Sequence, residues 1–227
     1  GRLPVHPAGG FFVCGLADLQ AERLWSAVAM ALKAWYNCGR NGRVDEKAIE
    51  AAMRVLVISD IHANLTAFQA VLDDAKGQWD FVWCLGDVVG YGPDPNECVD
   101  LLRTLPHLCL AGNHDWAALG RLDVRTFNSD ARKAVTWTAE TLRPDNLEYL
   151  AALPTTFVIG PYTLVHGSPR EPVWEYILDP LIATLNMSHF ETPYCLVGHT
   201  HTPVVFEMVS ERGDTEASLP VYGRPRS

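Results

Sequence analysis

Short apolar runs alternate with helical patterns along most of the chain, beginning with the run MRVLVIS at residues 53–59. Gly, Pro, Asp or Asn flank these runs, and this punctuation is typical of buried strands that end in turns. Because helical patterns separate the runs, the sequence predicts an α/β fold. The predicted strands lie at residues 53–59, 79–85, 106–111, 155–159, 162–166, 194–198 and 203–208.

Capping sequences mark several helix starts. Asp94-Pro95-Asn96-Glu97 combines an N-cap residue, a proline at the first helical position and a glutamate three positions after the cap. Asp145 to Glu148 repeats this logic and predicts a helix that ends before Pro154. Asp179-Pro180 opens a further helix, and we also expect one at about residues 17–36.

The character of the sequence changes at Met53. Residues 1–52 are slightly basic, whereas the remainder is strongly acidic, and Met53 opens the first strong strand pattern. We therefore predict an N-terminal extension over 1–52, partly helical and without an assigned function, and a principal folded domain over 53–227. Within this domain, residues 116–154 interrupt the series of strands and predict a helical cap insertion with a basic face.

Composition excludes several classes of function. The 227 residues are 48% hydrophobic, which is enough for a folded core, and no apolar stretch approaches the roughly 18 residues that span a bilayer. A net charge of −9 argues against long nucleic acids as partners. The six cysteines form no CxxC pair, which favours buried free thiols and a cytoplasmic location over disulfides. The sequence leaves the oligomeric state open.

Five short polar segments directly follow predicted strands. Taken singly, each is a common turn, but together they hold five of the eight histidines. Because open α/β sheets bind ligands at the carboxyl ends of their strands, we expect these side chains to converge. The segments are Asp60-Ile61-His62-Ala63-Asn64, Gly86-Asp87-Val88-Val89-Gly90, Gly112-Asn113-His114-Asp115, His166-Gly167-Ser168 and Gly198-His199-Thr200-His201.

The residue types in these segments indicate a metal site. Asp60 and His62 are two positions apart, so an extended backbone turns them to the same side. Carboxylate, amide and imidazole ligands without thiolate suit Mn, Fe, Zn, Co or Ni better than Ca or Mg. Asp115 and Asn64 are predicted to support the ligands from outside, Asp115 by orienting the ring of His114.

The ordered series D-x-H, GD-xx-G, GNHD, H-G and G-H-x-H resembles the calcineurin-like metallophosphoesterase superfamily over residues 53 to about 205. The resemblance implies a four-layer α-β-β-α sandwich with two packed mixed sheets and two divalent metal ions, of which we favour Mn. It assigns His114 and Asp87 to catalysis, with His114 outside the ligand set and Asp87 bridging. One ion would be held by Asp60, His62, Asp87 and His201, and the other by Asp87, Asn113, His166 and His199.

Departures from the family pattern bear on the substrate. Protein phosphatases of this superfamily carry GD-x-x-D-R-G, whereas residues 86–92 here lack the arginine that clamps a phosphomonoester. This favours a phosphodiesterase of the small bacterial branch that acts on small or nucleotide phosphoesters. A protein serine/threonine phosphatase or a dinucleoside tetraphosphatase is the alternative. A non-catalytic scaffold of the same fold is a second alternative, although every ligand position is retained.

Two further expectations concern the periphery of the domain. Residues 171–179 are a candidate rim of the site, with Trp174 and Tyr176 available for base stacking. After Glu207 the chain is polar, whereas family domains usually continue with strands that close the second sheet. The second sheet is therefore predicted to be truncated at the C-terminus.

Overall fold

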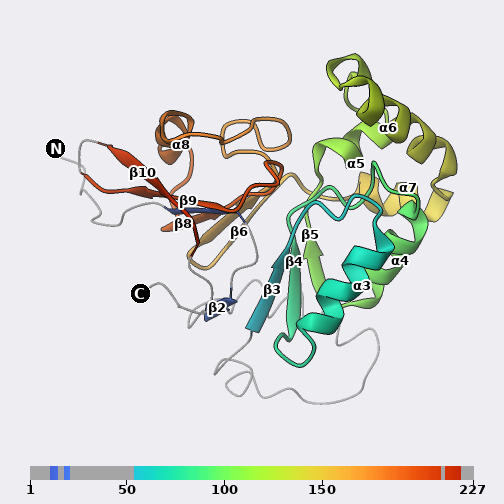
Figure 1. Ribbon diagram of the computed structural model, residues 1–227, viewed down its shortest axis with the longest axis horizontal. Coiled ribbons are helices and arrows are strands. Elements are labelled where there is room, and N and C mark those ends of the chain that lie inside the picture. Colours follow the sequence, from blue (N-terminus) through green and yellow to red (C-terminus); the bar gives the residue numbers. More distant parts are fainter. Residues whose placement is uncertain (1–10, 15–17, 21–53, 211–212, 221–227) are drawn as a thin grey trace.

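The computed structural model describes residues 11–14, 18–20, 54–210 and 213–220, whose strands form two sheets (Figure 1). The strand orders are β2-β3-β4-β5 and β10-β9-β1-β8-β7-β6. The α/β class predicted from the sequence is confirmed, and each predicted strand is present. Among the described residues, no helix combines the length and apolarity that crossing a membrane requires.

The smaller sheet supplies the first half of the strand ends. Strands β3 (Arg54–Ile58), β4 (Phe81–Cys84) and β5 (His107–Cys109) are parallel, with Val55 opposite Phe81 and Val82 opposite His107. Helix α3 (Leu65–Asp74) connects β3 to β4, and helix α4 (Pro95–Thr104) connects β4 to β5. Because the three strands are parallel, their carboxyl ends meet at one edge.

The larger sheet supplies the second half. Strand β6 (Thr156–Ile159) pairs antiparallel with β7 (Tyr162–Val165), and β7 pairs parallel with β8 (Tyr194–Leu196). Strand β9 (Val204–Met208) is followed by β10 (Thr215–Ser218) in antiparallel pairing. The polar stretch after Glu207 thus contains one strand that the sequence analysis missed.

The segment predicted to be an extension contributes one strand to each sheet. Strand β1 (Phe11–Cys14) lies between β8 and β9, and β2 (Asp18–Gln20) pairs antiparallel with β3. The predicted helix at 17–36 is therefore wrong at Asp18–Gln20, where backbone pairing with β3 replaces helical hydrogen bonds. The rest of that helix lies outside the described residues.

Strand β3 is buried on both faces, and its side chains alternate between two clusters. Val55 and Val57 of β3 join a cluster that also contains Leu164 of β7 and Leu196 of β8, so this cluster lies between the two sheets. Leu56 and Ile58, on the opposite face, pack with residues of the helices, among them Phe68 of α3. The period of two follows from strand geometry. Each buried Val, Leu or Ile side chain contributes roughly 1.5–3 kcal/mol to folding.

The helices mostly begin where capping residues predicted. Helix α4 starts at Pro95, and α8 (Pro180–Met187) starts after Asp179, whose side chain accepts a hydrogen bond from Ile182 N. Helix α7 (Pro144–Ala151) ends before Pro154 as predicted, but Asp145 is not its cap. Pro144 takes the first helical position, for which its fixed φ is suited. The remaining helices are α5 (Asn113–Ala118), α6 (Ser129–Thr141) and a 3-10 turn, η1 (Val124–Thr126).

Candidate metal centre

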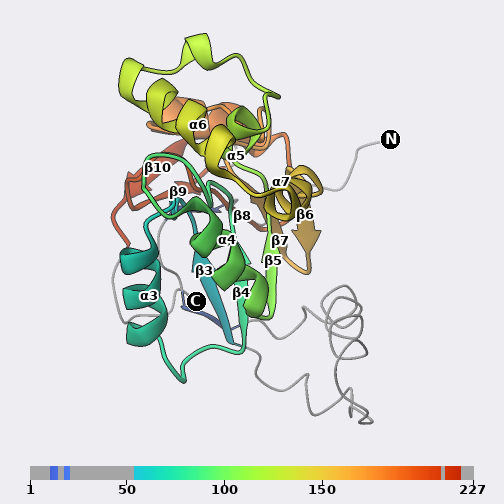
Figure 2. The same ribbon diagram turned by 90° about the vertical axis from the view of Figure 1, so that its right-hand side faces the viewer.

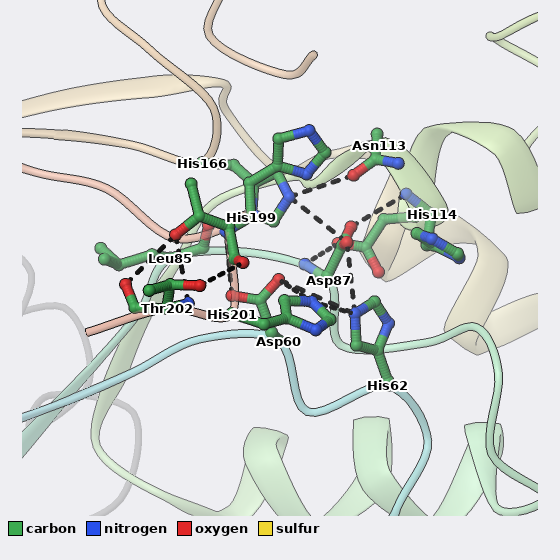
Figure 3. Close-up of polar contacts among 12 residues, drawn as sticks. Asp60, His62, Leu85, Asp87, Asn113, His114, His166, His199, His201 and Thr202 are labelled. Carbon is green, nitrogen blue, oxygen red and sulfur yellow. Dashed lines mark hydrogen bonds and ion pairs between the residues drawn. The ribbon is translucent and has the colours of Figure 1, made fainter. Parts of the chain in front are cut away.

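The structure brings the predicted ligands together where strands of both sheets end (Figure 3). The loops after β3, β4 and β5 approach from the smaller sheet, and those after β7 and β8 approach from the larger one. Their ligand atoms form overlapping groups whose members lie within 4.8 Å of one another. The side chains in the centre are Asp60, His62, Asp87, Asn113, His114, His166, His199 and His201.

Left-handed backbone turns aim several of these side chains. The φ angles of Asp60, His62 and Asp87 are 57°, 50° and 53°, and those of His199 and His201 are 67° and 54°. Each non-glycine residue in this region costs of order 1–3 kcal/mol. Backbone hydrogen bonds between loops hold the strained turns, because His62 N donates to Asp87 O at 2.9 Å and Asp60 N donates to Gly86 O at 3.0 Å.

The first group joins the loops after β3 and β8. His201 Nε2 lies 3.1 Å from Asp60 Oδ1 and 3.0 Å from His62 Nε2. His62 Nε2 lies 3.7 Å from Asp60 Oδ1 and also 3.7 Å from Asp87 Oδ2. One carboxylate and two imidazoles therefore face one point, with Asp87 on its inner side.

The second group lies on the other side of Asp87. His166 Nε2 is 3.3 Å from Asp87 Oδ2 and 3.1 Å from Asn113 Oδ1, and His199 joins this group. His199 Nε2 is 3.1 Å from Trp174 O, so Nε2 donates and Nδ1 keeps a lone pair. Asp87 Oδ2 thus lies between His62 of one group and His166 of the other.

Hydrogen bonds to the other ring nitrogens orient the imidazoles. His62 Nδ1 lies 3.3 Å from Val89 O and His166 Nδ1 lies 2.9 Å from Leu85 O, so Nδ1 is the donor in both contacts and Nε2 is the nitrogen that faces the centre. A cation bound there takes the lone pair of Nε2 in place of a proton. Ligand atoms about 2.1 Å from one ion are roughly 3.0–3.4 Å apart. The donor set and its spacing therefore fit divalent cations.

Burial and neighbouring charges shift the pKa of Asp87 in opposite directions. Burial would raise the pKa of this carboxyl, but the nearby histidines, His166 above all, hold it well below its usual range. Burial would lower the pKa of His166, yet Asp87 raises it to about 9. Burial lowers the pKa of His114 to about 4 and that of His199 to about 4. Opposing shifts of this kind are typical of functional sites.

The comparisons with known proteins agree with this geometry. Residues 53–203 match the family model described as calcineurin-like phosphoesterase. The chain belongs to this family. The matched range contains all five strand-end motifs, so the resemblance drawn from them is confirmed.

Two known proteins are similar to this chain in sequence, and a third is similar in fold alone. A solved metallophosphoesterase from Sphaerobacter thermophilus is 55% identical, with a TM-score of 0.60, over 67% of this chain and 62% of that chain. An uncharacterized protein of Methanocaldococcus jannaschii is 39% identical over 158 residues, 66% of this chain and 63% of its own. A hypothetical protein from Pyrococcus horikoshii OT3 is 18% identical with a TM-score of 0.50, over 72% of this chain and 86% of that chain, and shows likeness of fold alone. The chain spans less than two thirds of the length of the first two.

Asp115 supports the phosphoesterase centre in a way that differs from the prediction. Its carboxylate accepts hydrogen bonds from the backbone N–H groups of Asp87, Val89 and Gly112 at 2.9, 3.1 and 2.9 Å. It therefore does not orient the ring of His114, whose buried Nδ1 has no hydrogen-bond partner among the described residues. Burial, together with the charge of Asp87, raises the pKa of Asp115 to about 7. Asp115 instead fixes the loop that carries Asp87.

The Asn64 side chain caps a helix next to the centre. It accepts a hydrogen bond from Ala67 N at 3.0 Å at the start of helix α3. The polar side chain at the start of a helix satisfies a backbone N–H that has no partner within the helix. Asn64 also lines a cavity together with Asp60 and His62, and its cap fixes how α3 leaves the loop that carries these two residues.

Gly112→Ala tests how closely the loops pack around Asp87. Gly112 has a φ of −98°, so alanine brings no backbone strain, but its Cβ would lie 2.0 Å from Asp87 Oδ1 and 2.4 Å from Asp87 N. Overpacking of this kind costs roughly 1–3 kcal/mol and must displace Asp87. We expect a lower thermal midpoint and a lower metal content, measured by calorimetry and plasma mass spectrometry.

The matched control for this variant is Gly77→Ala. Nothing lies within 4 Å of a Cβ at Gly77, but its φ of 77° strains an alanine there. The control is therefore destabilised by backbone strain alone and keeps its metal. Equal metal contents in the two variants would contradict the close packing inferred at Gly112.

The segment 116–154 is helical as predicted. Helices α6 and α7 pack against α4 and α5 (Figure 2). Arg121 donates to Ala151 O, and Arg125 pairs with Asp123. The ring of Phe127, also in this segment, lies 5.1 Å from that of His114. The segment therefore gives His114 an apolar neighbour, and a phosphate-binding role of its basic residues stays a prediction.

The sequence analysis gave both aromatic residues of the rim, Trp174 and Tyr176, the same role, but the structure gives them different ones. The ring of Trp174 packs 5.2 Å from Phe127, and its carbonyl holds His199. Tyr176 stacks on His199 and is half-exposed. A third aromatic residue, Tyr91, borders His62 and His114, and the sequence analysis did not single it out. Its place between two glycines was the available signal.

Proposed function

We propose that this chain is a dinuclear-metal-dependent phosphoester hydrolase that acts on small phosphodiesters. The observation that carries the proposal is the position of Asp87, whose Oδ2 lies 3.7 Å from His62 Nε2 and 3.3 Å from His166 Nε2. One carboxylate is thus shared by two groups of ligand atoms, as a bridging ligand of two ions requires. Membership of the phosphoesterase family supports the reaction class.

The protein supplies two prearranged ligand sets and an acid-base candidate. Bound divalent ions, with Mn favoured, activate water and polarise phosphoryl oxygens. Strand ends and interloop hydrogen bonds fix the ligand positions, so little reordering accompanies catalysis. Burial lowers the pKa of His114 to about 4, so its neutral ring is available to donate a hydrogen bond to the charge that develops at the leaving oxygen or to hold a proton there. The ligands would be Asp60, His62, Asp87 and His201 for one ion, and Asp87, Asn113, His166 and His199 for the other.

A diester substrate is favoured over a phosphomonoester because two described loops at the centre offer no unpaired arginine for a second phosphate charge. Residues 86–92 contain no arginine. Arg170, on the loop that contacts His199, is committed to an ion pair with Glu175. A diester carries one charge fewer and depends less on such a clamp. A protein phosphatase or dinucleoside tetraphosphatase activity is the alternative outcome of the test.

The test uses purified protein stripped of metal and reloaded with Mn²⁺. We expect turnover of bis-p-nitrophenyl phosphate, a higher kcat/KM for it than for p-nitrophenyl phosphate, and loss of both activities with a chelator. Because the metal binds the folded state, Mn²⁺ also raises the thermal midpoint. Preference for the monoester supports the phosphatase alternative. Metal binding without turnover of either ester supports the scaffold alternative and rejects the proposal.

We also propose a reducing, cytoplasmic setting and the four-layer arrangement of the family for this domain. Cys84, Cys98, Cys109 and Cys195 are buried free thiols. Burial raises the pKa of Cys98 to about 12, so its thiol stays protonated and unreactive. For the layers, the support is a cluster between the sheets and separate clusters with helices on their outer faces.

A further inference from the structure

Two half-exposed tyrosines contact different histidines of the metal centre. Tyr91 is 48% exposed, and its ring lies 4.9 Å from that of His62 and 4.5 Å from that of His114. Tyr176 is 46% exposed and stacks on His199 at 3.6 Å with an interplanar angle of 26°. Each tyrosine therefore contacts a residue of the centre and turns part of its ring to solvent.

The backbone holds Tyr91 in this position at a cost. Its φ is 57°, a left-handed conformation that is an outlier for a bulky residue. The next residue, Gly92, donates its N–H to His62 O at 2.9 Å, and a Cβ on Gly92 would lie 2.5 Å from that oxygen. The loop is thus tied to the metal-binding turn, and the strain places an aromatic ring at the opening of the site.

A polar network fixes the loop that carries Tyr176. Glu175 accepts hydrogen bonds from Ser168 Oγ at 2.7 Å and Asn186 Nδ2 at 2.8 Å, and it pairs with Arg170. Because Glu175 precedes Tyr176 directly, the network immobilises the tyrosine before any ligand arrives. One face of the ring covers His199, and a ligand that stacks on the other face orders few additional groups.

Beside Tyr91 there is room for a small molecule. A cavity of about 790 Å³ is lined by Tyr91 together with Asp60, His62 and His201 of the first ligand group. Its volume is in the range of small-ligand sites. A phosphoester bound at the metal centre can therefore place one ester group in this cavity, whereas Tyr176, which does not line it, borders the second ligand group through His199.

We propose that the substrate carries a planar ring, a nucleobase or an aryl group, on one ester arm, and that this ring stacks on the exposed face of Tyr176. The proposal rests on the proposed function and narrows it to nucleoside or aryl phosphodiesters. Flat π surfaces favour flat partners, and stacking of a base on an aromatic side chain tolerates different bases.

The experiment compares two monoanionic diesters with the same leaving group, thymidine 5′-(p-nitrophenyl phosphate) and methyl p-nitrophenyl phosphate, in Mn²⁺. The wild-type protein is expected to prefer the thymidine ester in kcat/KM. Tyr176→Ala should reduce this preference about 5- to 150-fold, the range for loss of one stacked base. Tyr176→Phe keeps the ring and should keep the preference. Trp137→Ala removes another half-exposed aromatic residue, on α6, and should leave it unchanged.

Tyr176→Leu guards against an indirect effect through His199, because leucine still covers the imidazole but lacks a planar ring. It should retain metal and lose the preference, whereas an unchanged preference in Tyr176→Leu overturns the proposal. Calorimetric binding of thymidine 5′-monophosphate separates this inference from the reaction itself. If the wild-type protein hydrolyses neither ester, the proposed function fails. Stacking on Tyr176 is then supported only if Tyr176→Leu weakens binding of thymidine 5′-monophosphate at least about fivefold. An unchanged dissociation constant for this nucleotide overturns the stacking proposal.

Discussion

Asp87→Asn is expected to remove metal from both groups of ligands and to reduce phosphodiester turnover to the background rate. In the native protein Asp87 Oδ1 accepts the backbone N–H of His114 at 2.9 Å. An asparagine keeps that bond with its oxygen and therefore places its NH₂ group where Oδ2 lies. The NH₂ group would then point at His62 Nε2 and His166 Nε2 and donate protons to the lone pairs that a cation requires.

The loss should exceed the roughly 10- to 100-fold reduction in metal affinity that follows removal of an outer-shell partner, because a direct and shared ligand is lost. Metal content by plasma mass spectrometry and turnover of bis-p-nitrophenyl phosphate measure the effect. Asp80→Asn is the matched control, since it makes the same chemical change in a carboxylate that forms an exposed ion pair with Arg54. Wild-type metal content in Asp87→Asn would rule out the bridging position.

The convergence of the predicted ligands could be foreseen because the strand pattern and the sheet topology both restrict where these residues lie. A run such as Val55 to Ile58 alternates between two cores and must be a strand, and the ends of parallel strands must meet. Any polar residue immediately after such a run therefore lies at a known edge. Pattern and topology together place Asp60, Asp87 and Asn113 side by side without knowledge of any side-chain contact.

Roles that depend on local hydrogen bonding were harder to predict. Asp115 follows His114 directly, and adjacency in sequence favoured an orienting role, but the first turn of α5 points the carboxylate back to the N–H of Gly112. The spacing of three from Gly112 is that of a residue which caps its own helix. Asn64 and Ala67 have the same spacing. Capping was therefore the available signal at both positions.

Pairing across long stretches of sequence could not be predicted at all. Strand β1 has four residues, and its partners begin at Tyr194 and Val204. So short an apolar run carries no information about which distant strand it joins. The same limit applies to Trp174 and Tyr176, since the path of one loop decides that the first packs on Phe127 and the second stacks on His199.

His114→Ala is expected to keep the metal content and to lower kcat by roughly 10²- to 10⁴-fold, the range for loss of a positioned acid or base. The backbone N–H that binds Asp87 Oδ1 survives in alanine, so the bridging carboxylate keeps its support. The imidazole itself lies against Phe127 and Tyr91, and its buried Nδ1 has no hydrogen-bond partner among the described residues. Removing it should therefore change the reaction more than the fold.

Metal content decides between two roles that the geometry places close together. His114, His62 and Asp87 also form a group whose ligand atoms lie within 4.8 Å of one another. If His114 is a ligand, the alanine variant loses metal in proportion to activity. His107→Ala is the control, because His107 is a partly buried histidine that bonds Tyr149 Oη at 2.7 Å outside the site. A variant at His114 that retains both ions while kcat falls places the ring outside the ligand set and assigns it to the transition state, where it stabilises developing charge or transfers a proton.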